Sequence, residues 1–511
     1  MRKTAIIIML ITLFSKGFGF ARDITLSYFY GASSVSDAYL ISQTLPEVVF
    51  GFIVAGISTG YIPIYSSIHN QAGKKSALKF TNNLINVLFV LCLIFFAVAF
   101  VFAPQLVTLF ASGFDDATFD LAVNLTRIGL TGIYFTAVLS VFTGYLQMNG
   151  DYITPSATGF PLNIITILAI IVSAYVNNPL ILAVGTVLAT ASQVVMLLPS
   201  AIKRGYRYEW RMDWRDSFLI QMFKTSIPVM FGVSVNQINV LVDRTLASTI
   251  VEGGISVLNY SHMITFFIKG VFVVSIVSVM YPTVARLAAE GQMEGVKRAL
   301  KEVVTAISLI VIPATVGLIV FAEPIVNLLF VRGEFTVSDG LLTANVLIFY
   351  SLGMIGDGLR EVVSRVFYSL NDTRTPTINA VIGVVINVIL NILLSRYMGV
   401  SGLAFATSIS AIVTTLLLFY HLRKKMGPLQ IHAILRSLAK ILIASILMGV
   451  AAVVAYRYLI NHLNPTLVLF IAIAIGIIVY TVGIYWLKID DVENLRLLVK
   501  QQVSKFRNKA E

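Results

Sequence analysis

Two opposite charges, Arg22 and Asp23, lie side by side in an apolar run, within the stretch KGFGFARDITLSYFYGASSVSDAY (residues 16–39). Charged side chains are costly inside a bilayer, so a charged pair in a membrane-spanning run indicates a functional site. Adjacent residues are about 100° apart around a helix, which predicts that these two diverge too far for a good mutual salt bridge. We therefore expect each to find its partner in another part of the fold, in water or in a ligand. The alternative is an ion pair between helices that only holds the bundle together.

Further polar side chains interrupt the apolar runs in both halves of the chain. A guanidinium suits a pyrophosphate because its fixed fork binds two oxygens, and an ammonium adds a point charge. The cations available for an anionic headgroup are Lys16, Arg22, Arg244 and Lys269. The other polar residues of these runs are Asp23, Asp37, Gln43 and Glu47 in the first half, and Asp243, His262, Arg360, Glu361 and Arg365 in the second. Arg360 and Arg365 are interpreted as flanking the end of a helix, where they would belong to topology.

Asn387 and Asn391 lie four residues apart, hence on one face of a helix, and Thr407 follows in the next apolar run. Their oxygens, with the charge of Asp243, could hold a small cation such as sodium. The alternative is ordinary hydrogen bonding between helices by Asn and Thr side chains.

Sequence motifs argue against an enzyme. No P-loop, G-x-S-x-G or H-E-x-x-H pattern occurs, and the five His residues lack ligand spacings. Beyond the sodium ion, no cofactor is expected. Gly17 and Gly19 indicate close packing of small residues, since no strand precedes them. The single Cys92 excludes an internal disulfide and is interpreted as a small core residue.

The elements that must position these residues are membrane helices. The chain has 511 residues, 57% hydrophobic and 12% charged, with mean hydropathy +0.87, far outside the range of water-soluble domains. Apolar runs of about 20 residues recur throughout. They predict an all-α polytopic membrane protein with about fourteen helices, which start near residues 5, 37, 82, 120, 155, 178, 219, 255, 301, 340, 375, 400, 434 and 465. A membrane β-barrel is not expected, because alternating segments are absent from the sequence.

The basic residues behind the net charge of +12 are concentrated in alternate loops. This pattern indicates which side of the membrane each loop faces, and it does not indicate nucleic-acid binding. By the positive-inside rule, the N-terminus and a basic tail at 491–511 are cytoplasmic, and anionic lipid headgroups are the expected partner of the charge. The loops assigned to the cytoplasmic side carry Arg2, Lys3, Lys74, Lys75, Lys79, Lys203, Arg204, Arg207, Arg211, Arg215, Arg286, Lys297, Arg298, Lys301, Arg423, Lys424 and Lys425. The intervening loops carry few cations, Arg332 and Arg396 among them.

The sequence also repeats itself with an offset of about 220 residues. Arg22-Asp23 aligns with Asp243-Arg244, and Tyr39 aligns with Tyr260. Pro63 aligns with Pro282, Phe102-Ala103-Pro104 with Phe321-Ala322-Glu323-Pro324, and Leu146–Asn149 with Pro155 aligns with Tyr368–Asn371 with Pro376. Six helices per repeat, an even number, give both copies the same orientation. The prediction is an N-lobe at 1–210, a C-lobe at 211–425 and two further helices at 426–490, with residues 205–216 as a cytoplasmic linker.

The start of the chain also resembles a signal peptide with cleavage after Ala21. The repeat argues against that alternative, because cleavage would remove half of the duplicated charged arrangement. Residues 4–31 are therefore interpreted as a retained helix, and the first helices of the lobes are expected to line the cleft between them.

Four motifs resemble the MurJ (MviN-type) lipid II flippases of the MOP transporter superfamily: FSKGFGFARD at 14–23, GASSVSDAY at 31–39, LFVRGEF at 329–335 and RVFYSLNDTRTP at 365–376. The resemblance covers nearly the whole chain. It implies fourteen helices, a cationic cavity between two lobes and a groove at 426–490 for a polyprenyl tail. It further implies alternating access, which carries an undecaprenyl-pyrophosphate-linked peptidoglycan precursor from the cytoplasmic to the outer leaflet.

Carried over by position, the resemblance implies a substrate site and a sodium site. Lys16 stands where members usually have Arg, and Asn391 replaces an expected carboxylate in the sodium site. The implied substrate-binding residues are Lys16, Arg22, Asp23 and Asp37, and the implied sodium ligands are Asp243, Asn387, Asn391 and Thr407. Arg244, His262 and Lys269 are added as candidate substrate-binding residues from the polar side chains of the second half. Two departures follow: Phe50 replaces a frequent Arg, and His262-Met263 replaces an Asp-Arg pair. Lys269 and Arg244 are the candidates to replace the lost cations.

Three other functions stay open at this point. A flippase for another polyprenyl-linked saccharide, of exopolysaccharide or teichuronic type, fits the loss of cations at Phe50 and Met263. A cation-coupled drug exporter of the MATE type would need a net acidic cleft, against which Lys16, Arg22 and Lys269 argue. A membrane scaffold for cell-wall synthesis proteins gives no reason for symmetry-related charges inside helices, although such proteins are expected as additional partners.

Overall fold

The structure, a computed structural model, describes residues 2–487, and all its regular elements are helical. The side chains of residues 2–6, 228–229 and 231–236 are outside this description. The predicted basic tail at 491–511 also lies outside the described residues. The prediction of an all-α membrane protein is confirmed by these helices and by their apolar composition.

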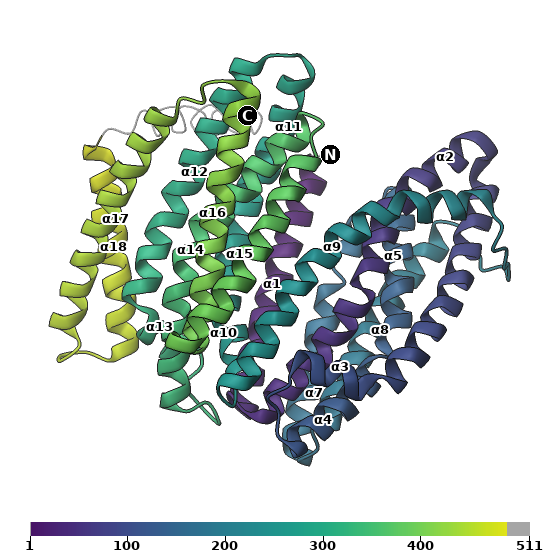
Figure 1. Cartoon of the computed structure of the whole chain (residues 1–511), viewed down its shortest axis with the longest axis horizontal. Helices are drawn as coiled ribbons and strands as arrows, with labels where there is room; N and C mark the ends of the chain where they lie inside the picture. Colours follow the sequence, from purple (N-terminus) through teal and green to yellow (C-terminus); the bar gives the residue numbers. More distant parts are fainter. Residues whose placement is uncertain (1, 488–511) are drawn as a thin grey trace, which may run out of the picture. The chain divides into compact units, whose positions relative to one another are not determined.

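Ten helices of the described chain are long and apolar enough to cross a membrane, or eleven if a bent pair counts as one span. This criterion does not establish the expected count of about fourteen. Helix α2 is one reason, because its 68 residues would extend about 100 Å if straight, against about 30 Å of hydrocarbon. Its backbone breaks at Gly73, whose φ of 77° lies in the left-handed region that favours glycine. Helix α2 therefore contains two spans joined by a tight bend (Figure 1).

The chain divides into two compact units. The first comprises Met1–Tyr260, Phe330–Gly340 and Asn391–Leu403. Its buried core is formed where α2 packs against α5 and α9, with Tyr61, Tyr65 and Tyr145 fully buried. Its helices are α1 (Arg2–Tyr30), α2 (Ser34–Val101), α3 (Ala103–Phe110), α4 (Asp116–Gly129), α5 (Gly132–Met148), α6 (Ile153–Ser156), α7 (Gly159–Val176), α8 (Leu180–Lys203) and α9 (Ser217–Ile250).

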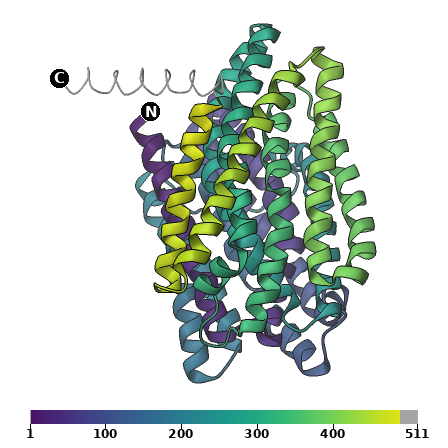
Figure 2. The same cartoon turned by 90° about the vertical axis from the view of Figure 1, so that its left-hand side faces the viewer.

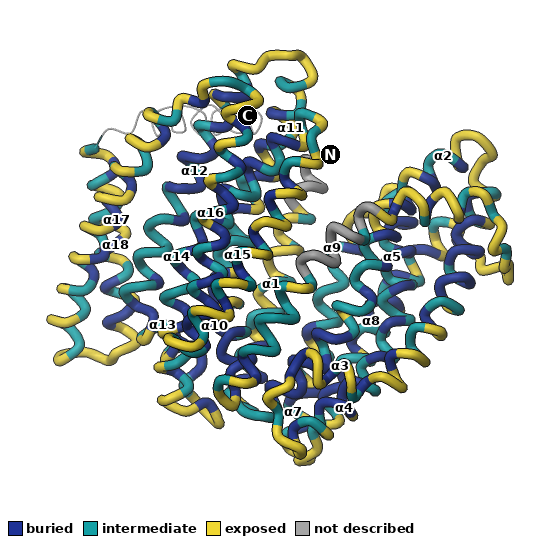
Figure 3. The backbone as a smooth tube through the Cα atoms, in the orientation of Figure 1, coloured by how far each residue is buried: buried dark blue, intermediate teal, exposed yellow. Residues whose placement is uncertain are grey.

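The second unit comprises Ser261–Leu329, Leu341–Leu390 and the described residues from Ala404 onward. Helices α17 and α18 lie side by side (Figure 1; Figure 2) and pack on α12 and α13. Figure 3 shows exposed residues along both of these helices. The helices that fall wholly or partly in this unit are α10 (Gly254–Ile268), the π-helix η1 (Lys269–Val273), α11 (Val274–Ala289), α12 (Met293–Val320), α13 (Ala322–Leu329), α14 (Val337–Ser369), α15 (Arg374–Met398), α16 (Val400–Met426), α17 (Ile431–Leu459) and α18 (Pro465–Trp486).

The sequence repeat recurs in the local structure of each unit. Helix α2 ends at Val101 just before the short helix α3, and α12 ends at Val320 just before the short helix α13. Tyr39 and Tyr260 are both buried to about the same extent, 1% and 0% exposed. The division into 1–210 and 211–425 stays a prediction.

A polar elbow is built twice, at positions 221 residues apart. In the first copy, Asp151 accepts hydrogen bonds from Thr154 N (3.0 Å) and Oγ1 (2.8 Å), and Arg204 Nη2 lies 3.4 Å from its carboxylate. In the second copy, Asp372 accepts from Thr375 N and Oγ1 (both 3.0 Å) and from Lys425 Nζ. Gly150 and Asn371, the preceding residues, both have positive φ, 79° and 57°. The duplicated sequence thus gives a duplicated helix start.

Candidate functional site

A charged cavity of about 200 Å³ lies within the first unit. It is lined by Arg22 and Asp23 from α1, by Gln43 and Glu47 from α2, and by Arg244 from α9. The remaining lining residues are Leu26, Tyr39, Leu40, Thr44, Ile170 and Asn259. Helices α1 and α9, whose charged segments align in the sequence repeat, therefore both contribute an arginine to this cavity.

Arg22 and Asp23 pair with each other, which contradicts the expectation that they diverge too far. Arg22 Nε donates to Asp23 Oδ1 at 3.0 Å, and Nη2 lies 2.9 Å from the same oxygen. The helical angle separates only the Cα–Cβ directions, and the long arginine stem bends far enough to close the gap. Asp23 is buried at 8% exposure, whereas the Arg22 side chain keeps 27%. The guanidinium of Arg22 therefore stays accessible to the cavity, and the buried carboxylate of Asp23 fixes its position.

Arg244 is anchored by the backbone. Its Nη1 donates to the carbonyl of Ile255, at the start of α10, at 3.2 Å. Because the carbonyl is neutral, the positive charge of Arg244 is not cancelled by this contact. Arg22 and Arg244 supply two guanidinium groups to the cavity, and Asp23 and Glu47 supply its carboxylates.

Asp37 and Lys16 are not among the residues that line this cavity. Asp37 is 2% exposed, and its carboxylate accepts from Ser256 N at 2.7 Å and Ile255 N at 3.4 Å. Unpaired N–H groups at a helix start attract a carboxylate, so Asp37 acts as a cap for α10. Lys16 lies half-buried on α1, six residues or about 9 Å along the helix from Arg22.

A larger cavity of about 550 Å³ in the same unit shares Gln43 and Glu47 with the charged one. Phe50 lines it, at 3% exposure, with its ring 5.8 Å from that of Phe95 in an edge-on contact. Its wall is otherwise mostly small, apolar or hydroxylated, from Ser42, Pro46, Gly51, Val54, Ala55, Gly129, Gly132, Ile133, Thr136, Ala183, Thr186, Thr190 and Gln237. Phe50 thus places an aromatic ring on the cavity wall, at the position where members of the resembled family often have Arg.

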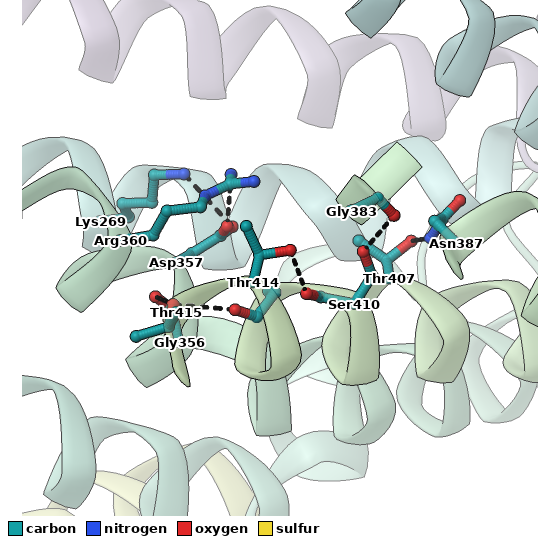
Figure 4. A network of polar contacts seen from close by, with 11 residues as sticks. Lys269, Gly356, Asp357, Arg360, Gly383, Asn387, Thr407, Ser410, Thr414 and Thr415 are labelled. Carbon is teal, nitrogen blue, oxygen red and sulfur yellow. Dashed lines mark hydrogen bonds and ion pairs between the residues drawn. The ribbon is translucent and has the colours of Figure 1, made fainter. Parts of the chain in front are cut away.

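The second unit has its own charged cluster, built on Asp357 (Figure 4). Lys269 Nζ lies 3.3 Å from Asp357 Oδ2, and Arg360 Nη2 lies 2.7 Å from Oδ1. His262 shares a small cavity with Lys269 and Asp357, and its ring contacts Phe266 and Tyr350. The cluster carries two permanent cations for one carboxylate, so it keeps a net positive charge.

Sequence reasoning missed Asp357 and placed Arg360 at a helix end. The structure places Arg360 well inside α14, where it pairs with Asp357 one turn earlier. The available signal was the i,i+3 spacing of Asp357 and Arg360 within an apolar run, which is typical of a pair on one helix face. Arg365 pairs with Glu361 at 2.9 Å on the same helix, as a partly exposed ion pair.

The cluster rests on a polar face of α16 that packs against α14 and α15 (Figure 4). Thr415 Oγ1 donates to the carbonyl of Gly356 at 2.7 Å, and Ser410 Oγ donates to the carbonyl of Gly383 at 2.6 Å. Small residues let the helices approach closely, which is the usual way to pack helices in a membrane. Lys269 is the first residue of the π-helix η1, and π-turns inside helices are frequent at functional sites.

The four expected sodium ligands form two pairs. Asn391 Nδ2 donates to Asp243 Oδ1 at 2.6 Å within the first unit, and Asn387 Nδ2 donates to Thr407 Oγ1 at 3.2 Å within the second. All four carry hard oxygen donors, which fit sodium chemically. Among the described residues, no group of three or more His, Cys, Asp or Glu side chains could hold a metal. Asp243 is the only carboxylate among these four side chains.

A further cavity of about 350 Å³ lies where α17 and α18 meet α13. Its lining combines Glu323 and Asn327 of α13 with Tyr456 of α17 and with Pro465 and Thr466 of α18. This hollow adjoins the two helices predicted to bind a lipid tail.

Comparison with known proteins identifies the family. The sequence model of the family described as "Lipid II flippase MurJ" matches residues 26–475. The chain belongs to the MurJ family of lipid II flippases. MurJ proteins are transporters, so the prediction of a transporter in place of an enzyme is confirmed. The match also agrees with the motifs that carried the resemblance, three of which fall wholly within it.

Individual members of the MurJ family match over most of their length. The "Probable lipid II flippase MurJ" of Vibrio cholerae is 30% identical over 443 residues, covering 83% of this chain and 84% of the relative. The protein of the same name from Thermotoga maritima is 26% identical over 485 residues, covering 95% and 96%. A solved structure, "Lipid II flippase MurJ, inward closed conformation", has TM-score 0.80 and 26% identity, covering 94% of this chain and 98% of that one.

MATE transporters share the fold of this MurJ family member. An inward-facing multidrug resistance MATE family transporter of the MOP superfamily has TM-score 0.68 at 16% identity, covering 83% of this chain. At that identity the likeness concerns the fold alone. The chain is thus a multi-pass membrane protein of a bacterial flippase family, with MOP superfamily neighbours.

Proposed function

We propose that this chain flips lipid II, the undecaprenyl-pyrophosphate-linked peptidoglycan precursor, from the inner to the outer leaflet of the bacterial cytoplasmic membrane by alternating access. The observation that carries the proposal is the family match over residues 26–475, joined to a cavity that Arg22 and Arg244 line from equivalent helices. A pyrophosphate needs charged donors in a partly desolvated site, and guanidinium groups meet that need.

The charged cavity would bind the pyrophosphate. Asp23 contacts the guanidinium of Arg22 and so holds it in place at the cavity. A pyrophosphate oxygen would add contacts to the exposed side of Arg22 and to Arg244. Charge-assisted hydrogen bonds are short and directional, which favours one orientation of the headgroup.

The larger cavity beside it would accept the saccharide and peptide part of the headgroup. Gln43 and Glu47 line both cavities, so the two are contiguous at this wall. Amide and hydroxyl groups match sugar hydroxyls, and the ring of Phe50 offers an apolar face to a sugar ring. Lys269 and His262, at the Asp357 cluster of the second unit, are proposed as further substrate-binding residues.

The outward surface of α17 and α18 would hold the polyprenyl tail. Large apolar side chains are exposed along it, including Leu447, Val454, Phe470 and Ile478. In this proposal both termini face the cytoplasm, because the loops rich in Lys and Arg then all fall on that side. Cell-wall synthesis proteins that consume the flipped lipid are proposed as partners at the outer face.

Sodium would couple to transport through Asp243. The proposed ligands are Asp243 and Asn391 in the first unit and Asn387 and Thr407 in the second, and an ion at Asp243 would supply positive charge to the carboxylate. The hydrogen bond from Asn391 to Asp243 keeps two of these residues in contact.

Rescue of depleted cells tests the proposal. Cells depleted of their own lipid II flippase should regain wall synthesis and shape when this chain is expressed, and the Arg22→Ala variant, present in the membrane in equal amount, should fail. If the wild-type chain does not rescue, lipid II is not its substrate. In that event, the presence of Phe50 in place of the usual cation favours a flippase for another polyprenyl-linked oligosaccharide. Rescue of an exopolysaccharide flippase mutant by this chain would identify that substrate class.

A further inference from the structure

The linker between α8 and α9 is a strap with a strictly alternating sequence. Its even-numbered residues are aromatic or Met: Tyr206, Tyr208, Trp210, Met212 and Trp214. Its odd-numbered residues are all charged: Arg207, Glu209, Arg211, Asp213 and Arg215. Residues 206–213 are neither helix nor strand, so the alternation is not a helix pattern. Two of the three tryptophans of the whole chain lie in this strap of residues 206–215.

Three asparagines of α2 hold the strap by its backbone. Asn82 Nδ2 donates to the carbonyl of Arg207 at 2.9 Å, and Asn86 Nδ2 donates to that of Arg211 at 2.8 Å. Asn83 makes a two-way contact with Asp213, donating to its carbonyl at 2.9 Å and accepting from its N–H at 2.7 Å.

Two tyrosines of the strap complete the attachment to α2. The hydroxyls of Tyr206 and Tyr208 donate to the amide oxygens of Asn82 and Asn86, both at 2.8 Å. The backbone of the strap is thereby fixed at its start, middle and end before any partner binds. A surface ordered in advance loses little conformational entropy on binding.

The side chains of the strap that stay exposed are apolar or aromatic and, apart from Glu209, basic. Trp210 is 76% exposed and Trp214 46% exposed, and Met212 between them is also exposed. The arginines at 207, 211 and 215 are exposed, and within the described residues they make no ion pair. Two acidic residues of the segment are used internally: Asp216 caps α9 through Phe218 N, and Asp213 accepts from Arg215 N.

The strap directly follows the end of an apolar helix. It begins three residues after Lys203, where the apolar helix α8 ends, and Lys74 beside the bend of α2 donates to the carbonyl of Arg204 at 2.8 Å. Tryptophan is enriched at the bilayer interface, and each Lys or Arg near an anionic surface is attracted to it. None of the four cavities described above is lined by a strap residue.

We propose that the strap is a binding surface for anionic phospholipid headgroups, with Trp210 and Trp214 in the interface and Arg207, Arg211 and Arg215 on the phosphates. In the orientation given above, the leaflet concerned is the cytoplasmic one, so the inference rests on that part of the proposed function. Because Asn82, Asn83 and Asn86 of α2 hold the strap, its binding to lipid would keep this end of the first unit at a fixed depth in the membrane.

Fluorescence of the strap tryptophans tests the inference in the full-length protein. In a Trp486→Phe variant, the strap holds both remaining tryptophans. The protein is placed in nanodiscs that contain phosphatidylglycerol or phosphatidylcholine, brominated near the glycerol, at the same mole fraction. We expect stronger quenching from the brominated anionic lipid.

Substitution of the three arginines provides the contrast. Arg207→Gln, Arg211→Gln and Arg215→Gln together should remove the preference for the anionic lipid, by up to about fivefold in local enrichment per arginine. Glu209→Gln, on the same strap, should keep or strengthen it. Thermal unfolding in detergent should be unchanged in all these variants, because the substituted side chains are exposed.

Two results would overturn the inference. Equal quenching by both lipids would remove the role of the arginines. No quenching by either lipid would place the tryptophans away from the bilayer. The strap would then be a surface for a partner protein and not for lipid. A failure of lipid II transport with the quenching preference intact would count against the proposed function alone.

Discussion

Lys425 Nζ lies 2.6 Å from Asp372 Oδ2 in the second repeat. Arg204 and Asp151 form the equivalent ion pair in the first repeat. In both copies the carboxylate caps the next helix start, and the cation comes from the end of the last helix of its repeat. The hydrogen bonds Asp151 N to Leu146 O (2.8 Å) and Asp372 N to Phe367 O (2.9 Å) are also equivalent. The elbow therefore ties two helix ends together in each repeat, and this duplication is independent of how the units are arranged.

Replacement of Asp372 should destabilise the protein. Asp372→Asn removes the ion pair with Lys425 and weakens the cap at Thr375, which should cost about 0.5–2 kcal/mol. The measurement is thermal unfolding in detergent. Asp151→Asn should act in the same direction, and Asp120→Asn, an exposed carboxylate on α4, is the matched control that should change little.

The contribution of Asp372 should depend on pH in the acid range. Burial alone raises its pKa, but hydrogen bonds from Lys425 and Thr375 outweigh this and lower the pKa to about 2. An unfolded aspartate has a pKa of about 3.9, so the stabilisation is complete above about pH 4 and is lost as the pH falls toward 2. The gap in unfolding temperature between wild type and Asp372→Asn should close over that window. A gap that stays constant down to pH 2 would contradict the assignment.

A methyl group at Gly356 should disrupt the packing of α14 on α16. A Cβ there would lie 2.9 Å from Ile412 N and 3.0 Å from Ala411 C, both backbone atoms that cannot rotate away. We expect Gly356→Ala to cost about 1–3 kcal/mol, as overpacking does. Gly317→Ala on α12 is the control, because its Cβ would meet nothing within 4 Å and alanine favours a helix. Equal unfolding temperatures for the two variants would refute the close contact.

The charged cluster of the second unit should respond unequally to loss of its members. Asp357→Asn leaves Lys269 and Arg360 without their shared carboxylate, which should cost about 1–3 kcal/mol. Lys269→Ala leaves Asp357 paired with Arg360 and should cost less than about 1 kcal/mol. The double variant should be no less stable than Asp357→Asn alone, since both changes remove the same interaction. Chemical unfolding of the four proteins checks this order, and a larger loss from Lys269→Ala would reverse it.

Sodium should stabilise the wild-type protein through Asp243. We expect the unfolding temperature to rise when choline chloride is replaced by sodium chloride at constant ionic strength, because an ion bound only by the folded state adds stability. Asp243→Asn should remove the rise, and Asp120→Asn should keep it. If wild type unfolds at the same temperature in both salts, these residues hold no sodium ion and the alternative of hydrogen bonding between helices stands.

The sequence predicted the features that depend on local pattern. Apolar runs predicted the helical membrane class, and the repeat aligned the segments at Phe102 and Phe321, where the structure ends α2 and α12. The repeat also aligns the charged segments of α1 and α9, and the structure places Arg22 and Arg244 along one cavity. These inferences succeed because helix formation and duplication leave direct traces along the chain.

Contacts over long sequence distances could not be predicted in the same way. Asp37 is indistinguishable in sequence from a cavity residue, yet it caps α10 through Ser256, 219 residues away. The pairing of Arg22 with Asp23 was missed because helical angles describe Cβ directions and ignore the reach of a long side chain. Asp357 was missed because only the fold shows that Lys269 and Arg360 meet at the same carboxylate.

The most direct measurement is the rate of lipid II translocation in proteoliposomes that contain purified protein. Arg22→Ala and Arg244→Ala should each slow translocation by about 10- to 100-fold, the loss expected for one charged hydrogen bond in the cavity. Arg22→Lys should lie between, since an ammonium keeps the charge but not the fork. Arg127→Ala, a cation on α4 outside the cavity lining, should translocate at the wild-type rate. Wild-type rates for both Arg22→Ala and Arg244→Ala would contradict the assignment of the charged cavity as the pyrophosphate site.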